Sequence, residues 1–355
     1  MPVVAHTQLP TFERLRNEGF EITEPVANST ARRLHIGVLN LMPDAALEAT
    51  ERQFIRLLAG AGSQTDIYVH VFTVPEMPRV GKAKMLVDTH YSSIEDIESH
   101  GLDGLILTGA NPANPELTQE PYWPGMARVI EWARGNVSSI LCSCLATHAV
   151  VRQYHGIERI KLPEKRWGVY SHRLIDTEHP LVRHGNTRFD APHSHVYEVT
   201  SEQLTGVGIR VLAESEVAGV HLAVSPDLYQ FVYFQGHPEY DFNSLFKEYK
   251  REVSRFADGT RDDYPPFPEN YLRGAAAEAM TDFEQCLKAA SVSARIALFR
   301  EFPEAVATSA LENSWADTGK AMFANWLRLV EQISPENPLE KLKPGLDADD
   351  PLGLR

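Results

Sequence analysis

The chain has 355 residues, of which 43% are hydrophobic and 23% are charged, so it can bury a large core. Its net charge of −14 at pH 7 argues against nucleic acid or an acidic membrane surface as the main partner. The sequence has no apolar run of the ~20 residues that a membrane helix needs. It also lacks a signal-peptide pattern and has only three cysteines, so we expect a cytoplasmic protein with reduced thiols.

The first half of the chain alternates apolar runs with amphipathic segments. The expected strands are 34–42, 66–72, 104–108 and 138–143. The expected helices are one around Phe54, Leu57 and Leu58 and two more over 94–100 and 123–135. This order predicts an α/β fold with a mostly parallel sheet flanked by helices. Ligands of such sheets bind at the carboxyl ends of the strands.

Two other segments of the first half are less regular. Residues 1–33, interrupted by Pro10 and Pro25, are expected to form an N-terminal extension that lies mainly over the surface. Residues 75–91 are rich in Pro, Gly and Lys and are expected to form a loop. A loop of this length suggests a role at a site rather than a simple connection.

The second half begins with a polar connection over 154–166 and continues with short, antiparallel-style strands between 168 and 236. Helices are expected over 243–257, 275–302 and 315–333. We therefore expect one α/β domain over 34–333, with a helical insertion at about 270–310. Residues 334–355 contain four prolines and are expected to form a mobile tail.

The most informative stretch is the expected strand 138–143 with the helix that follows it. Cys144 lies at the turn between them, at the positive end of the helix dipole, which favours a thiolate. Such an elbow can present a nucleophile together with a backbone N–H for a developing oxyanion. Cys142 lies inside the strand and is expected to be a packing residue. Because C-x-C without further ligands nearby is a poor metal signal, we expect no metal site.

A base for this thiol is expected at the end of a later strand. His237 and Glu239 follow the apolar residues 231–234. Residues two apart in an extended segment point to the same side, so Glu239 can hold one imidazole nitrogen and leave the other free to take a proton. Each residue alone could be structural, since the chain has 14 histidines. Together they favour an activated-thiol acyl transferase or hydrolase.

Several motifs in this order resemble the homoserine O-succinyltransferase/acetyltransferase family of methionine biosynthesis, which shares the fold of class I glutamine amidotransferases. They are Asn40-Leu41-Met42-Pro43, Asp103-Gly104-Leu105-Ile106-Leu107-Thr108-Gly109-Ala110, Tyr122-Trp123-Pro124, Ala191-Pro192-His193-Ser194 and Gly236-His237-Pro238-Glu239-Tyr240. The resemblance covers about 34–260 and resumes around 315–333. It implies acyl transfer from an acyl-CoA, used as co-substrate without a further cofactor, to the hydroxyl of homoserine. A homodimer is also implied.

The resemblance also implies residue roles. Cys144 would carry the acyl group, His237 would be the base and Glu239 would orient it. Backbone N–H groups of Leu145 and Ala110 would hold the oxyanion. The positions expected to bind substrate are Lys165, Ser194 and Arg251. The same positions could also be two solvated charges and a turn residue.

Ala113 matches the position that distinguishes acyl donors in the family, where glutamate accompanies acetyl-CoA and glycine accompanies succinyl-CoA. Alanine is small and uncharged and leaves room for a succinyl carboxylate, so we expect succinyl-CoA. A purely local structural role of Ala113 is the competing interpretation.

The chain departs from the family pattern where Asp44-Ala45-Ala46-Leu47 replaces the usual lysine after Pro43. Acetyl-CoA as donor and serine as acceptor therefore remain alternatives. A glutamine amidotransferase-like hydrolase is an alternative of another class, and a non-enzymatic relative is disfavoured by the intact Cys144, His237 and Glu239.

Overall fold

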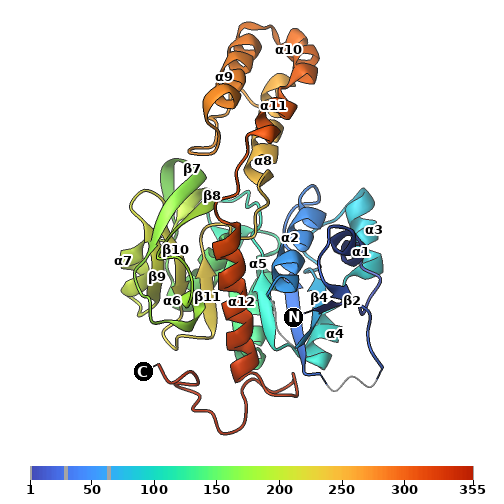
Figure 1. Cartoon of the computed structure of the whole chain (residues 1–355), viewed down its shortest axis with the longest axis vertical. Helices are drawn as coiled ribbons and strands as arrows, with labels where there is room; N and C mark the ends of the chain where they lie inside the picture. Colours follow the sequence, from blue (N-terminus) through green and yellow to red (C-terminus); the bar gives the residue numbers. More distant parts are fainter. Residues whose placement is uncertain (1, 28–30, 62–64, 355) are drawn as a thin grey trace.

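The expected α/β fold is confirmed by the computed structural model, which describes residues 2–27, 31–61 and 65–354. Residues 1 and 28–30 of the expected extension and residue 355 of the expected tail lie outside this description. The described strands form one eleven-stranded sheet in the order β2-β1-β4-β3-β5-β6-β11-β10-β9-β7-β8, with helices on its faces (Figure 1). Among the described residues, no helix has both the length and the apolarity that crossing a membrane requires.

The sheet has a parallel and an antiparallel half. The parallel half consists of β1 (Val3–Val4), β2 (Ile22–Thr23), β3 (Arg33–Leu39), β4 (Asp66–Phe72), β5 (Gly104–Leu107), β6 (Ser139–Ser143) and β11 (Phe231–Phe234). The antiparallel half consists of β7 (Ile160–Leu174), β8 (Arg188–Glu198), β9 (Arg210–Ser215) and β10 (Gly219–Val224), with β10 paired to β11.

Helices cover the parallel half on both faces. The α-helices are α1 (Pro10–Asn17), α2 (Leu47–Ala59), α3 (Gly81–His90), α4 (Ile94–His100), α5 (Trp123–Asn136), α6 (Leu145–His155), α7 (Ser201–Thr205), α8 (Ser244–Ala257), α9 (Gly274–Ala289), α10 (Val292–Leu298), α11 (Glu304–Ser309) and α12 (Ala316–Ile333).

The central strands bury both of their faces, which explains their unbroken apolar sequence. Ile106 of β5 belongs to the apolar core on the side of Trp326 in α12. Its neighbour Leu105 belongs to the core on the side of Ile130 in α5. Each such side chain stabilises the fold by roughly 1.5–3 kcal/mol on burial. The carboxyl ends of β5, β6 and β11 are thereby held rigidly, and the site described below lies there.

The N-terminal residues differ from the expectation of a surface extension. β1 pairs with β4 and β2 pairs with β1, so both extend the edge of the parallel sheet. Val3 and Leu15 are completely buried. The segment 75–91 also differs, because its second part forms α3.

The polar residues expected to form a connection over 154–166 instead contribute to α6 and to the fifteen-residue strand β7. A register shift between Lys161 and Arg166 interrupts the pairing of β7 with β8. Such a bulge changes the direction in which the intervening side chains point. Lys165 lies within it and lines the pocket described below.

The helices α9, α10 and α11, which lie in the expected insertion, project beyond α8, away from the sheet (Figure 1). The C-terminal segment does not project in this way. Leu342, Leu346 and Leu352 pack against the main core, and Nζ of Lys343 donates to the carbonyl of Gln332 at 2.8 Å. The residues expected to form a mobile tail are therefore in contact with the body of the protein.

Candidate active site

The nucleophile candidate Cys144 lies at a sharp turn between β6 and α6. Its backbone has φ of 51° and ψ of −108°, a conformation that is strained for a residue with a side chain. The turn is fixed on both sides, since the N–H of Cys144 donates to the carbonyl of Phe234 at 2.7 Å and its carbonyl accepts from the N–H of Thr147 at 3.0 Å. The thiol is partly exposed. The elbow expected from the sequence is therefore present.

Cys142, two residues earlier, has a different environment. Its side chain is fully buried in the core between the sheet and α5. Burial raises the pKa of its thiol well above the usual value. A neutral thiol of this kind is a poor nucleophile, so the two cysteines are distinguished by their surroundings.

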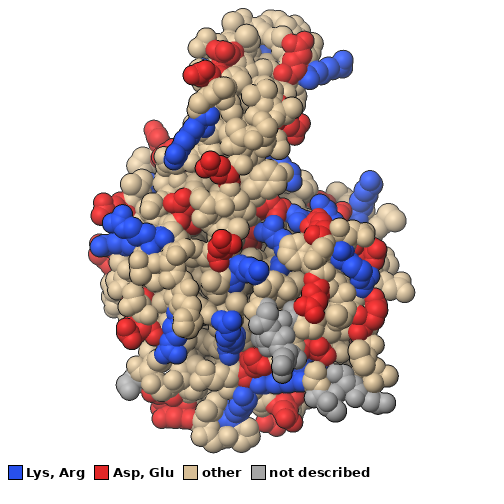
Figure 2. Space-filling view, in the orientation of Figure 1, with Lys and Arg blue, Asp and Glu red and all other residues tan. Residues whose placement is uncertain are grey.

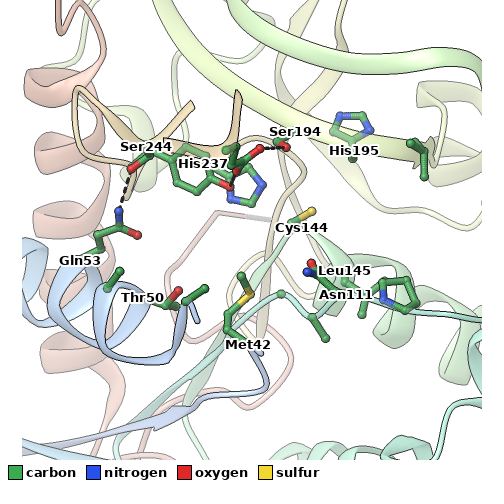
Figure 3. A pocket seen from close by; sticks show the side chains of 18 of the residues that line it. Met42, Thr50, Gln53, Asn111, Cys144, Leu145, Ser194, His195, His237 and Ser244 are labelled. Atoms are coloured by element: carbon green, nitrogen blue, oxygen red, sulfur yellow. Dashed lines mark hydrogen bonds between the residues drawn. The ribbon is translucent and has the colours of Figure 1, made fainter. Parts of the chain in front are cut away.

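Sheet register brings His237 close to Cys144. Phe234 of β11 pairs with Ser143 of β6, so the residues that follow each strand leave the sheet side by side. The N–H of His237 donates to the carbonyl of Pro192 at 2.8 Å, which fixes the backbone of the base. The imidazole also lies beside the side chain of Cys144, and this interaction helps to raise the pKa of His237. In Figure 3 the His237 ring and the Cys144 side chain lie next to one another.

Glu239 holds the far side of the imidazole. Nδ1 of His237 donates to Oε1 of Glu239 at 2.8 Å, and both side chains are buried. Burial acts to lower the pKa of His237, but the charge of Glu239 and the interaction with Cys144 outweigh it, so the pKa is raised well above the usual value. The arrangement therefore favours a charged imidazolium at His237 beside the side chain of Cys144.

Two backbone N–H groups lie near the thiol. Leu145 is the first residue of α6, and amides at that position have no acceptor within their own helix. Ala110 follows β5 and lines the same pocket. Its neighbour Gly109 lies so close that a Cβ on it would be 3.7 Å from the Cβ of Cys144. Leu145 and Ala110 thus both line the cavity that contains Cys144, and their role as oxyanion donors stays a prediction.

The thiol opens into a cavity of about 500 Å³. One wall comes from the start of α2 and the segment before it, and the opposite wall from β8 and α8. In Figure 3 Cys144 lies between Ser194 and His237 on one side and Met42 on the other. All three expected substrate-binding residues, Lys165, Ser194 and Arg251, line this cavity.

Glu248, which the sequence analysis did not select, organises that opposite wall. Its Oε2 accepts from Oγ of Ser194 at 2.6 Å and lies 3.4 Å from Nζ of Lys165, while Oε1 accepts from the hydroxyl of Tyr240 at 2.6 Å. Burial acts to raise the pKa of Glu248, but Lys165 and the two hydroxyl donors outweigh it and lower the pKa. Tyr240 also stacks on His237, with ring centroids 4.2 Å apart. Glu248 therefore links Ser194 and Lys165 to Tyr240, the ring that stacks on His237.

Two cations lie closer to the rim. Nε of Arg251 is 3.3 Å from Oε1 of Glu252, and its side chain is half exposed. Arg159, which the sequence analysis also missed, donates to the carbonyls of Asn114 and Pro115 at 3.0 and 2.7 Å, and its guanidinium lies over the ring of Tyr197. Arg159 therefore fixes one conformation of the loop after β5.

Ala113 belongs to that loop but is exposed, whereas its neighbours Asn111 and Pro112 line the cavity. The structure therefore places Ala113 beside the pocket lining, next to the carbonyls that Arg159 holds.

The segment without the family lysine is held by Arg79. Its guanidinium donates to the carbonyls of Asn40 and Met42 and lies 3.3 Å from Oδ1 of Asp44. Ala45 and Ala46 then line the cavity with small side chains. Arg79, from the segment 75–91, thus holds the residues that lead into the cavity lining.

Comparison with known proteins identifies the family. The family model described as homoserine O-succinyltransferase matches residues 2–336. A homoserine O-succinyltransferase of Methylococcus capsulatus is 51% identical over 356 residues and covers 100% of both chains. One of Methylobacter tundripaludum is 50% identical with the same coverage, and one of Thiothrix nivea is 50% identical over 100% of this chain and 99% of its own. The chain belongs to the homoserine O-succinyltransferase family.

Membership in the homoserine O-succinyltransferase family confirms the resemblance found in the sequence. Similar solved structures include a glutamine amidotransferase from Methylobacillus flagellatus, with 16% identity, a TM-score of 0.47 and coverage of 90% of this chain and 99% of its own. Another is a glutamine amidotransferase from Thermotoga maritima, with 12% identity, a TM-score of 0.44 and coverage of 84% and 98%. Likeness at this distance carries no argument about this chain.

Proposed function

We propose that this enzyme transfers a succinyl group from succinyl-CoA to the hydroxyl of L-homoserine, giving O-succinyl-L-homoserine and CoA. This is the first step of methionine biosynthesis from homoserine. The observation that carries the proposal is the arrangement of Cys144, His237 and Glu239 at the cavity, in a chain of the homoserine O-succinyltransferase family. Acidic and basic side chains are interspersed on the face drawn in Figure 2, as suits an enzyme of small substrates.

In the first half-reaction the Cys144 thiolate attacks the thioester carbonyl of succinyl-CoA. The N–H groups of Leu145 and Ala110 stabilise the oxyanion of the tetrahedral intermediate. The intermediate collapses by breaking the bond to the CoA sulfur, and His237 gives its proton to that leaving thiolate. The products are CoA and a succinyl thioester on Cys144, with His237 left neutral.

In the second half-reaction neutral His237 takes the proton of the homoserine hydroxyl as its oxygen attacks the Cys144 thioester. The same backbone amides hold the second oxyanion. Collapse expels the Cys144 thiolate and restores the ion pair with His237. Glu239 keeps the imidazole oriented and stabilises its charged form at both stages.

Homoserine recognition requires partners for a carboxylate and an ammonium group. Arg251 at the rim suits the carboxylate because its guanidinium can donate two parallel hydrogen bonds. Glu248 offers a buried negative charge to the ammonium group, with Ser194 and Lys165 setting its position. A shorter acceptor such as serine would present its hydroxyl farther from His237 when held by the same contacts.

The donor is selected at the loop after β5. A succinyl group differs from an acetyl group in its terminal carboxylate, and Arg159 is a cation lining the same pocket as Cys144. A glutamate at position 113 would lie on the loop whose carbonyls accept hydrogen bonds from Arg159. Its carboxylate would compete with the succinyl carboxylate for the Arg159 guanidinium. Residue 113 can therefore influence the choice of acyl donor through Arg159, even though Ala113 itself is exposed.

The cytoplasmic location and the homodimer stay predictions. Analytical ultracentrifugation of the full chain tests the dimer, because a sedimentation coefficient of a monomer at micromolar concentration would contradict it.

A thiol-release assay tests the proposed reaction. Purified protein is incubated with succinyl-CoA or acetyl-CoA and with homoserine or serine, and free CoA is measured. The proposal expects fast release only with succinyl-CoA and homoserine together. Preference for acetyl-CoA or for serine would replace the corresponding substrate. Glutamine hydrolysis without acyl-CoA consumption would instead support the hydrolase.

A further inference from the structure

Three buried histidines that the acyl-transfer mechanism does not use converge beside the active site. His172 comes from β7, His193 from β8 and His221 from β10. One ring nitrogen from each lies within 4.8 Å of the other two. These residues are far apart in the sequence and match no metal-binding spacing, so the sequence analysis did not select them.

The protons in this cluster can be assigned from the carbonyls around it. Nδ1 of His172 lies 2.8 Å from the carbonyl of Tyr170, and Nδ1 of His195 lies 2.7 Å from the carbonyl of Tyr197. Carbonyls only accept, so both Nδ1 atoms carry the proton of their neutral rings. Nε2 of each ring is therefore a bare lone pair.

His193 lies between those two lone pairs. Its Nε2 is 3.1 Å from Nε2 of His172, and its Nδ1 is 3.0 Å from Nε2 of His195. A neutral imidazole has one N–H and can satisfy only one of them. Adding a second proton would place a charge on a completely buried ring, which is unfavourable. In one of the two contacts, with His172 or with His195, two nitrogen lone pairs therefore face each other with no proton between them.

His221 adds a further unsatisfied nitrogen. Its Nδ1 is buried and, among the described residues, has no hydrogen-bond partner. A Cβ on Gly236 would lie 2.6 Å from that atom and 2.8 Å from Nε2 of His193. Both nitrogens therefore face the space that Gly236, lacking a side chain, leaves open. The rings of Phe189 and Phe234 pack against His221 and make the surroundings apolar.

We propose that His172, His193 and His221 bind a divalent transition-metal ion, with zinc as the best match. Nε2 of His172, Nε2 of His193 and Nδ1 of His221 would be the ligands, and water would take the fourth position. His193 would then donate its Nδ1–H to His195, and every assigned proton has one acceptor. Two zinc-bound nitrogens lie ~3.3 Å apart in tetrahedral geometry, close to the separation of His172 and His193.

The neighbouring hydrogen bonds match what metal sites use. Ligating imidazoles usually donate their other N–H to a carbonyl or another acceptor, which fixes the tautomer. His172 does so toward Tyr170 directly, and His193 does so through His195. The ion would link β7 and β8 to β10 through one ligand from each strand. This link lies next to Gly236 and therefore close to His237, and β8 also carries Ser194.

Metal analysis tests this proposal directly. The full-length protein is treated with chelator, dialysed against zinc chloride and then against buffer, and analysed by mass spectrometry of the elements. The proposal expects one zinc ion per chain and a higher melting temperature with zinc. Cobalt substitution should give the visible absorption of a low-coordinate nitrogen site. Wild-type protein that retains no zinc above the background of a metal-free control protein would overturn it.

Variants locate the ion. His221→Asn and His172→Asn should each reduce retained zinc by roughly tenfold or more. His179→Asn is the matched control, because His179 is a buried histidine outside the cluster, and it should retain the wild-type amount. Equal retention by all three variants contradicts the site. If the cluster variants do not fold, X-ray absorption at the zinc edge of wild-type protein decides instead, since fewer than three nitrogen ligands of imidazole type would also contradict it.

Discussion

Oε1 of Glu239 lies 2.8 Å from Nδ1 of His237, and only 3% of the Glu239 residue surface is exposed. A buried carboxylate in this position fixes the tautomer of the imidazole and stabilises its charged form. It therefore makes the other nitrogen of His237 available to Cys144. The reactivity of the thiol depends on this second contact as much as on its own position.

Glu239→Gln should lower the rate of enzyme acylation by roughly 10²–10⁴-fold, because an amide accepts the same hydrogen bond but carries no charge. Losing that charge also lowers the pKa of His237. The imidazolium is then lost at lower pH, so the alkaline limb of the pH profile of kcat/KM for succinyl-CoA should move to lower pH. An alkaline limb that stays where the wild type has it would show that Glu239 does not act through His237.

Arg251→Ala should raise KM for homoserine by roughly 10–100-fold, the size expected for a lost charge-assisted pair, while acylation by succinyl-CoA alone stays close to wild type. Arg255→Ala is the matched control. Arg255 lies on the same helix, has similar exposure and contacts the same Glu252, but it is not part of the cavity lining. Steady-state kinetics with varied homoserine measures both. An equal effect of the two variants would remove Arg251 from the binding site.

Arg159→Met should reduce kcat/KM for succinyl-CoA by roughly tenfold or more relative to acetyl-CoA, since only the former has a carboxylate to pair with the guanidinium. Ala113→Glu should shift the preference in the same direction. Competition between the two donors in one reaction gives the ratio of specificity constants directly. A ratio unchanged in both variants would place donor selection elsewhere in the pocket.

Glu51 on α2 should make folding stability pH-dependent. Burial raises its pKa from 4.5 to about 7, although hydrogen bonds from Thr11 and Tyr91 act in the opposite direction. Between these pH values the unfolded chain loses the proton while the folded chain keeps it, so wild-type stability falls as pH rises. Glu51→Gln has no titrating group at this position. Its free energy of unfolding, relative to that of wild type, should therefore be about 3 kcal/mol more favourable at pH 8 than at pH 4.5. Urea unfolding of both proteins at pH 4.5 and at pH 8 measures this. The same difference in free energy of unfolding between variant and wild type at both pH values would contradict it.

The parts of the site that the sequence predicts are those set by local patterns. The elbow at Cys144 depends on a buried strand followed by a helix, and both are visible as apolar periodicity. The pairing of His237 with Glu239 was expected from their spacing of two residues. The extended conformation assumed for it is wrong, because the segment forms a turn in which the N–H of Tyr240 donates to the carbonyl of His237. The parallel strands of the centre are similarly apparent, because strands buried on both faces need continuous apolar runs.

The parts that the sequence did not predict depend on contacts between distant segments. Glu248 acquires its role only when α8 docks on β7 and β8, which brings it to Ser194 and Lys165. The role of Arg159 depends on its hydrogen bonds to the loop after β5, which is more than 40 residues away in the sequence. The strands β1 and β2 have two residues each, too few for a periodic pattern, and the polar start of β7 is held in place by its pairing with β8.

A covalent intermediate at Cys144 is the central requirement of the proposed mechanism. Wild-type protein is mixed with succinyl-CoA without homoserine, quenched in acid, and analysed by mass spectrometry of the intact chain and its peptides. We predict one succinyl group on the peptide that contains Cys144, removed on addition of homoserine. Cys142→Ser should still form it, and Cys144→Ser should lose both the adduct and most turnover. The mechanism would be contradicted by wild-type turnover without an adduct, or by an adduct that persists in Cys144→Ser and disappears in Cys142→Ser.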